Sequence, residues 1–342
     1  MAVFRSSPET FTVHEVPAYE PSGDGAHAYV FVEKRGLTTP DAIRLLAEAV
    51  GVNPRDVGYA GMKDKHAVTR QWLSFPETAQ TALAALDGAV LAARGLGIVS
   101  LSRHNNKLRI GHVRKNVFEV TLEQVDDGEA ETLSRTYQRL AQEGVPNRYG
   151  QQRFGVTDNV AEGLALLRRQ KRQPDRRKRT FLMSAVQSAV FNHVLDERVA
   201  QKLLTQVLAG DVLQKRPTGG LFTSTDAPTD QARLDAGELV ITGPLPGVKA
   251  PRPSAGSPAE ALESAAMAAV GLTEELVQAN ARDLPGARRP LVMNVESLAP
   301  PAFRDGRMVL NFALPAGAYA TVVVEALLGR RGDPDLPEGP PT

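Results

Sequence analysis

The sequence predicts an α+β fold in which one domain is inserted into another. Strand patterns dominate residues 11–122, helical patterns dominate residues 160–280, and strand patterns return after residue 290. This order is expected when one domain is interrupted in sequence by a second. With 342 residues, of which 42% are hydrophobic and 23% charged, the chain is long and apolar enough for two ordinary cores.

The amino-terminal third alternates between strands and helices. Strands are expected at residues 11–16, 28–32, 56–60, 68–75 and 117–122. A helix is expected between Thr39, which with Pro40 supplies an N-cap and a first-turn proline, and Gly51. A polar helix is expected at residues 129–143, where Gly144 ends it.

The centre of the chain is helical, and strands return near its end. Helices are expected at residues 160–169, 181–204, 259–280 and 319–328, and a strand at residues 308–312. Residues 218–258 are rich in Gly, Pro and Thr. The Pro-rich, acidic residues 331–342 are expected to be disordered.

The composition excludes several classes of function. The chain has no cysteine, which excludes disulfides, thiolate zinc sites and a cysteine nucleophile. The amino terminus lacks the apolar core of a signal peptide, and no stretch approaches the roughly 20 apolar residues of a membrane span. We therefore expect a cytoplasmic protein with no membrane partner.

Positive charge is clustered although the net charge is only +1. Eight Lys or Arg residues lie between Arg168 and Arg179 against one acid, and five lie between Arg103 and Lys115 with none. Two such clusters on a neutral chain suit a surface that binds a polyanion, with solvated loops as the alternative.

The first polar cluster with chemical potential is residues 58–67, which read GYAGMKDKHA. The spacing is not that of a phosphate-binding P-loop. Two glycines would allow a sharp turn that presents Asp64 between Lys63 and Lys65. A carboxylate among cations can serve as a nucleophile or general base, and a surface turn is the alternative.

The second polar cluster is residues 144–155, which read GVPNRYGQQRFG. Asn and Gln amides can recognise the edges of bases, and the ring of Tyr149 can stack on a base. The alternative is a loop whose aromatic side chains are buried.

Both clusters resemble motifs of one known family. Residues 61–72, GMKDKHAVTRQW, closely resemble the catalytic motif of the TruD family of tRNA pseudouridine synthases. Residues 145–155, VPNRYGQQRFG, resemble the next signature of that family. Further matches follow in the family's order at residues 8–11, 182–192, 241–247 and 314–321. The resemblance extends from about residue 5 to residue 330.

The resemblance implies an activity and a fold. The activity is that of a cofactor-free isomerase, without a metal, that converts the uridine at position 13 in the D-arm of transfer RNA to pseudouridine; no obligate protein partner is evident. The fold is the pseudouridine synthase α+β fold, with a mixed, largely antiparallel sheet, plus an inserted α+β domain specific to TruD. We expect the catalytic domain at residues 1–172 and 293–330 and the inserted domain at residues 173–292.

The resemblance also implies roles for individual residues. Asp64 matches the nucleophile, and Arg5 matches the basic residue that pairs with it. Substrate contacts are implied for Phe11, Asn147, Tyr149 and Tyr319, with Tyr149 stacking on the target uracil. We assign to the RNA backbone the residues Lys63, Lys65, Arg153, Arg176, Arg177 and Lys178. Whether the carboxylate attacks the sugar, deprotonates it or attacks the base stays open.

Two other classes of function are compatible with the same residues. One is an RNA-binding protein or RNA chaperone whose catalytic site is vestigial. The other is a nucleoside-handling enzyme, such as a glycosylase, that releases the free base. A metal site is not expected, since His66, His104 and His193 lack ligand spacing with carboxylates.

Overall fold

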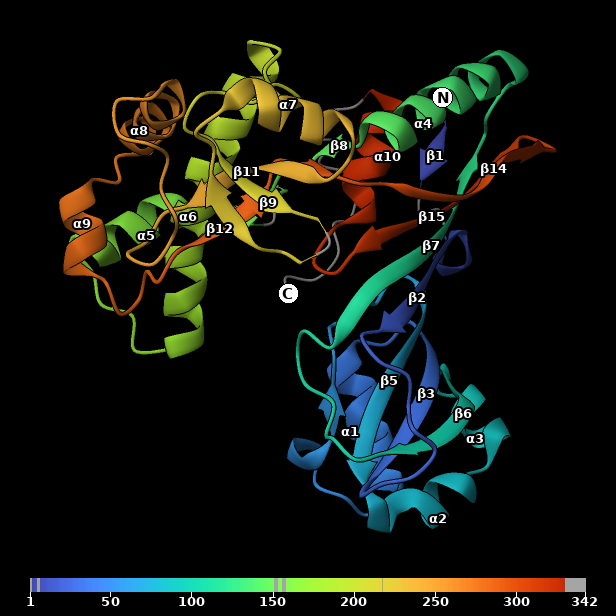
Figure 1. Cartoon of the computed structure of the whole chain (residues 1–342). Coiled ribbons are helices and arrows are strands. Elements are labelled where there is room, and N and C mark those ends of the chain that lie inside the picture. Colours follow the sequence, from blue (N-terminus) through green and yellow to red (C-terminus); the bar gives the residue numbers. More distant parts are fainter. Residues whose placement is uncertain (1, 5–6, 151–152, 156–157, 217, 330–342) are drawn as a thin grey trace. The chain divides into compact units, whose positions relative to one another are not determined.

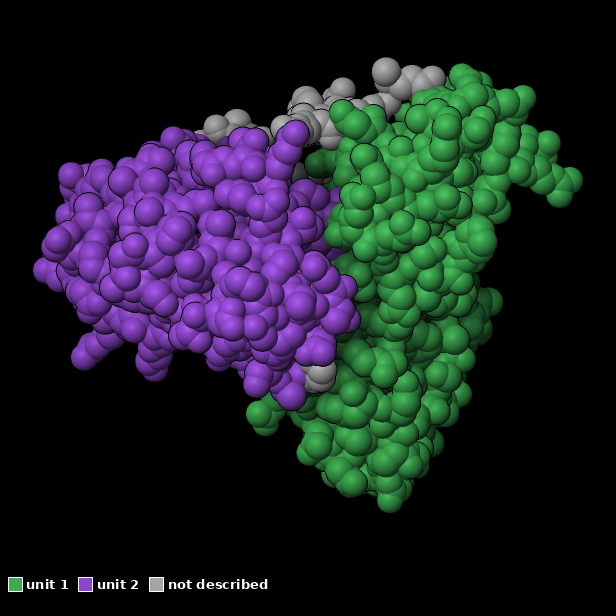
Figure 2. Space-filling view, turned by 45° about the horizontal axis from the view of Figure 1, so that its top comes forward, with its two compact units in different colours: residues 1–144, 294–342 green, residues 145–293 purple. Residues whose placement is uncertain are grey.

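The computed structural model describes residues 2–4, 7–150, 153–155, 158–216 and 218–329. The chain divides into two compact units (Figure 2). Unit 1 comprises residues 1–144 and 294–342, and unit 2 comprises residues 145–293. The expected tail at residues 331–342 lies outside the described residues.

Unit 1 is built on a mixed sheet of nine described strands (Figure 1). They are β1 (Val3–Phe4), β2 (Phe11–Pro17), β3 (His27–Arg35), β4 (Gly58–Tyr59), β5 (Val68–Pro76), β6 (Leu96–His104), β7 (Val113–Glu123), β14 (Glu296–Arg304) and β15 (Arg307–Pro315). The order is β14-β15-β7-β2-β5-β3-β6, with β1 on β7 and β4 on β5. Among these strands β2 and β5 form the one parallel pair. The expected mixed, largely antiparallel sheet is therefore confirmed.

Helices cover this sheet because their apolar faces match the inward positions of the strands. They are α1 (Thr39–Ala49), α2 (Gln80–Ala84), α3 (Gly88–Ala92), α4 (Asp127–Glu143) and α10 (Ala320–Leu328). Helix α1 buries Ile43 and Leu46 against β3 and β5 (Figure 1). Its N-cap is Thr38, whose side chain accepts from the backbone N–H of Asp41; Thr39, the expected cap, is instead the first helical residue and is buried.

Unit 2 combines antiparallel strands with helices. Its elements are β8 (Val145–Pro146), α5 (Asn159–Leu167), α6 (Arg176–Ala200), β9 (Val212–Lys215), β10 (Leu221–Thr223), α7 (Ala227–Asp235), β11 (Leu239–Leu245), α8 (Pro258–Val270), α9 (Glu274–Ala279), β12 (Ala287–Pro290) and β13 (Val292–Met293). The order β10-β9-β11-β12 forms one sheet, and β8 pairs with β13. Helix α6 packs against α5, α8 and β11 (Figure 1).

The inserted unit begins at Val145 rather than at residue 173, which corrects the expected boundary. Leu166 and Leu167 of α5 belong to the same buried cluster as the apolar residues of α6. Gly163 approaches α6 so closely that an added Cβ would lie 2.4 Å from the carbonyl oxygen of Leu182. Because α5 has its core on α6, a boundary at residue 173 would cut through one packed cluster.

Several elements also differ from the expected ranges. The helix expected at residues 259–280 is two helices, since Gly271 ends α8 with a φ of 78°. Helix α6 starts at Arg176 instead of residue 181, so part of the basic cluster is helical. No helix among the described residues combines the length and apolarity that crossing a bilayer requires.

Candidate active site

Asp64 lies on a loop of unit 1 between β4 and β5, and within this loop Asp64 and Lys63 are buried. Asp64 is 9% exposed and Lys63 is 7% exposed. One carboxylate oxygen of Asp64, Oδ1, accepts a hydrogen bond of 2.9 Å from the backbone N–H of His66. This local bond fixes the direction of the side chain, and the burial does not fit a mere surface turn.

Buried polar side chains of the neighbouring elements hold the backbone of this loop by hydrogen bonds. The Lys34 ammonium donates to the carbonyl oxygens of Asp64 at 2.8 Å and Lys63 at 3.3 Å. The Thr39 hydroxyl accepts from the backbone N–H of Lys63 at 2.9 Å and donates to Gln71 at 2.8 Å. Gln71 in turn donates to the carbonyl of Gly61 at 3.2 Å. The loop thus rests on three positions that are 1% exposed or less.

The structure corrects the role predicted for Lys63. Its ammonium forms a buried ion pair of 2.5 Å with Glu15 of β2, whose other oxygen accepts from the backbone N–H of Trp72. Burial raises the pKa of Glu15, and the charge of Lys63 opposes that shift. An ammonium held inside the unit is not available to a phosphate, so we assign Lys63 to the loop scaffold. Lys65, by contrast, is exposed.

Lys34 and Glu15 are functional candidates that sequence reasoning missed. Lys34 continues the inward series Ala28, Val30 and Val32 of β3, and Glu15 continues the inward series of β2. A charged residue at a core-facing position of a strand is rare unless it is paired. The strand pattern in the sequence shows that Lys34 and Glu15 face the core. It does not show that the partners of these charges lie on the loop that carries Asp64.

The glycines of this cluster act differently from the predicted sharp turn. Neither Gly58 nor Gly61 has a positive φ. Gly58 is needed because an added Cβ would lie 2.4 Å from the carbonyl oxygen of Leu108 and 2.5 Å from the Ser74 hydroxyl. The absence of a side chain at Gly58 therefore lets the backbone at Leu108 pack closely against β4.

The other predicted site residues of unit 1 differ in accessibility. Phe11 is 3% exposed, stacks on Phe118 at 6.0 Å between ring centroids and meets Phe4 edge-on at 5.6 Å. The ring packs within the sheet core, and the substrate contact of Phe11 stays a prediction. Tyr319 is half-buried at the N-cap of α10, where its side chain makes no capping bond. Arg5, the predicted partner of Asp64, lies outside the described residues.

In unit 2, Asn147 is held by the strand β12. Its amide nitrogen donates to the carbonyl of Pro290 at 2.9 Å, and its amide oxygen accepts from Arg289 at 2.5 Å. These two partners fix which way the carboxamide points. Arg289 was not predicted as a site residue.

Tyr149 lies within a group of cations and rings. The Arg289 guanidinium carbon lies 4.3 Å from the centroid of its ring, and that of Arg153 lies 5.5 Å away. Phe191 packs edge-on at 5.6 Å. Asn192 exchanges two hydrogen bonds with the backbone of Tyr149, at 3.0 Å and 2.9 Å. The structure thus brings Tyr149 and Arg153 together and orders the ring before any substrate binds.

The basic residues at the start of α6 are exposed. Arg176, Arg177 and Lys178 form the first turn, and Asp175 caps the helix by accepting from the backbone N–H groups of Arg177 and Lys178. Positive side chains at a helix N-terminus oppose the helix dipole, so stability does not explain this cluster.

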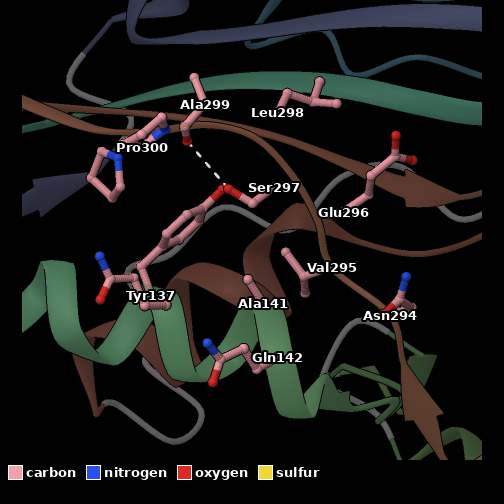
Figure 3. A pocket seen from close by; sticks show the side chains of 12 residues that line it. Tyr137, Ala141, Gln142, Asn294, Val295, Glu296, Ser297, Leu298, Ala299 and Pro300 are labelled. Atoms are coloured by element: carbon pink, nitrogen blue, oxygen red, sulfur yellow. Dashed lines mark hydrogen bonds between the residues drawn. The ribbon is translucent and has the colours of Figure 1, made fainter. Parts of the chain in front are cut away.

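Unit 1 also contains a pocket that involves none of the predicted residues. It has a volume of about 530 Å³ and lies between α4 and β14, where Tyr137, Gln142 and Ser297 line it (Figure 3). The strands β15, β7 and β2 separate β14 from β5 in the sheet order. Among the described residues, no group of three or more His, Asp or Glu side chains is arranged to hold a metal.

Comparisons with known proteins agree with the motifs around these sites. The sequence profile described as tRNA pseudouridine synthase D (TruD) matches residues 1–174 and 171–327. The chain belongs to the TruD family. It is a pseudouridine synthase, an isomerase that acts on transfer RNA.

TruD relatives match over nearly their whole length. A tRNA pseudouridine synthase D of Anaeromyxobacter sp. (strain Fw109-5) is 44% identical, with 98% of this chain and 94% of that protein covered. One from Thermus thermophilus is 37% identical, with coverages of 95% and 88%. A crystal structure of a Methanosarcina mazei protein described as TruD has a TM-score of 0.74 at 20% identity, covering 97% of this chain and 94% of that one. This structural match supports the fold.

Proposed function

We propose that this TruD-family chain isomerises the uridine at position 13 in the D-arm of transfer RNA, with Asp64 as the nucleophile. The position follows from the resemblance of residues 61–72 and 145–155 to the two signatures of the family. The role of Asp64 is supported mainly by its loop, because the buried side chains of Lys34 and Thr39 hold the backbone of Lys63 and Asp64 by hydrogen bonds. We expect this reaction to take place in the cytoplasm, which suits a transfer RNA substrate.

The chemistry requires one bond to break and another to form on the same two fragments. The bond from the ribose C1′ to uracil N1 breaks, the base rotates, and C1′ joins C5. The hydrogen of C5 leaves as a proton while N1 gains one, so the reaction is balanced without a cofactor. Breaking the glycosidic bond gives the sugar oxocarbenium character, which a carboxylate such as that of Asp64 stabilises.

The substrate contacts are assigned to the residues whose side chains remain accessible. Asn147, Tyr149 and Tyr319 contact the nucleoside, and Tyr149 stacks on the uracil. The exposed cations Lys65, Arg176, Arg177 and Lys178, together with Arg153, contact the RNA backbone. Because a stacked base is out of reach of a loop carboxylate, the target uridine is flipped out of the RNA helix.

The test is to incubate the protein with an unmodified tRNA transcript and to map pseudouridine by carbodiimide-stop sequencing. The expected result is one new stop at position 13, absent from a transcript with cytidine there, and no free uracil. A stop at another position contradicts the proposed specificity. Free uracil without pseudouridine favours a glycosylase instead.

A further inference from the structure

Lys34 is a fully buried lysine whose hydrogen bonds all go to backbone carbonyls. It is 0% exposed, and its ammonium donates to the carbonyls of Leu37 at 2.7 Å, Asp64 at 2.8 Å and Lys63 at 3.3 Å. An ammonium has three N–H groups, so these three acceptors use its full capacity. The side chain therefore ties the end of β3 to the loop that carries Asp64.

This arrangement is costly for stability alone. Removing an ammonium from water is strongly unfavourable, and an apolar side chain of similar volume would often serve a core better. What the charge achieves is local: the carbonyls of Lys63 and Asp64 belong to the peptide groups on either side of the Asp64 Cα. Holding both peptide groups fixes the backbone torsions that set the direction of the carboxylate.

We propose that Lys34 is a positioning residue for Asp64, which it serves by clamping the peptide groups on both sides of the aspartate from inside the protein. The inference rests on the proposed function, because it assumes that Asp64 carries the reaction. The bonds of Thr39 and Gln71 hold the amino-terminal half of the loop, and the Lys34 clamp holds the peptide groups of Asp64 itself.

The protonation of Lys34 gives this role a signature. Burial lowers the pKa of Lys34 to about 7; the carboxylates of Asp64 and of Asp41 on α1 oppose the shift, and the ammonium of Lys63 adds to it. A neutral amine has only two N–H groups, and its lone pair would face a carbonyl oxygen. The clamp therefore loosens when Lys34 loses its proton, and we expect the chemical step to slow as the pH rises above neutral.

The test compares Lys34→Met with the wild type in single-turnover pseudouridine formation and in tRNA affinity. The expected result is a rate lowered about 100-fold, the cost of a misplacement of about 1 Å, with tRNA affinity unchanged. Lys34→Gln, which keeps two N–H groups without the charge, should retain an intermediate rate. Both variants should lack the alkaline decline of the wild-type rate.

The matched control is Arg139→Met, which removes an exposed cation of α4 that is not among the charges acting on Lys34. It should leave the rate and its pH profile unchanged. A folded Lys34→Met with the wild-type rate and pH profile overturns the inference. If neither Lys34 variant folds, the wild-type profile decides: a single-turnover rate that is constant from about pH 6 to 9 overturns it.

A further variant separates this inference from the proposed function. If Asp64→Asn keeps the wild-type rate, the proposed nucleophile is wrong whatever Lys34 does. If Asp64→Asn is inactive while Lys34→Met is fully active, the inference about Lys34 alone fails.

Discussion

Charged side chains at inward positions of strands organise the site at the level of single residues. Lys34 binds carbonyls of the Asp64 loop, and Glu15 holds the ammonium of Lys63. The motif predicted that Asp64 lies on a loop, and it does; its role as the nucleophile stays a prediction. The motif could not predict that Lys63 points inward, because its partner Glu15 is 48 positions away in the sequence.

Arg289 could not be predicted from the motifs either, although it contacts two residues that were predicted to bind the substrate. It lies over the ring of Tyr149 and binds the amide oxygen of Asn147. Arg289→Lys keeps the charge but loses the planar stack and the paired geometry. We expect it to lower kcat/KM for tRNA by about tenfold or more, because both contacts lose their fixed orientation.

The control for this prediction is Arg252→Lys, which alters an exposed pair with Glu274 in the same unit. It should leave kcat/KM unchanged. An Arg289→Lys enzyme with wild-type kinetics would show that Asn147 and Tyr149 need no such support.

At the scale of elements, periodicity predicted the strands β2, β3, β5 and β7 and the helices α1 and α4 within a few residues. It missed β6, whose middle residues are exposed, and the short strands β9 to β12, which tertiary pairing defines. It also started α6 too late, since a run of cations carries no apolar repeat. Those cations are the part of the helix that suits an RNA ligand.

The first turn of α6 should affect stability and binding in opposite directions. Replacing Arg176, Arg177 and Lys178 together with Gln removes charges that oppose the helix dipole, so the free energy of unfolding should rise by about 1 kcal/mol. tRNA affinity should fall, and the slope of its logarithm against the logarithm of salt concentration should become shallower by about two to three. Thermal unfolding and a salt titration of affinity measure the two effects. The control is Lys249→Gln, at an exposed position elsewhere in unit 2, which should change neither quantity. An unchanged salt slope in the triple variant would show that the first turn of α6 does not contact the RNA.

The strand β4 depends on the close approach at Gly58. Gly58→Ala places a methyl group against the Leu108 carbonyl and should lower the free energy of unfolding by about 1–3 kcal/mol. Gly88→Ala is the matched control, because an added Cβ at this first residue of α3 would meet nothing within 4 Å. This substitution should raise the free energy of unfolding by about 0.5–1 kcal/mol, since alanine favours a helix over glycine. Urea unfolding of both variants is the measurement, and equal effects would contradict the assigned role of Gly58.

At the scale of the whole molecule, the sequence indicated an interrupted α+β domain but not the start of the insertion. The signature loop around Tyr149 and the helix α5 both pack on α6, and these contacts place residues 145–172 in unit 2. The resemblance to the family implied a later boundary, at residue 173. Long-range packing, which composition does not encode, determines the earlier one.

The titration of Lys34 should also make the free energy of unfolding depend on pH. The pKa of Lys34 is about 7 in the folded protein and near 10.5 when exposed, so between these values the unfolded state binds the proton that the folded state has lost. Stability therefore rises with pH in this window, by up to about 1.4 kcal/mol per pH unit. Urea unfolding between pH 7 and pH 10 should show this slope in the wild type relative to Lys34→Met. Parallel curves for the two proteins would mean that Lys34 is not buried as an amine of lowered pKa.

The most direct measurement of the central claim follows the hydrogen that the isomerisation must release. A tRNA transcript labelled with tritium at C5 of its uridines should lose label to water with the wild-type protein. Asp64→Asn should bind the same tRNA with unchanged affinity and release no tritium above background. Tritium release by Asp64→Asn at the wild-type rate would contradict the assignment of Asp64 as the group that carries the reaction.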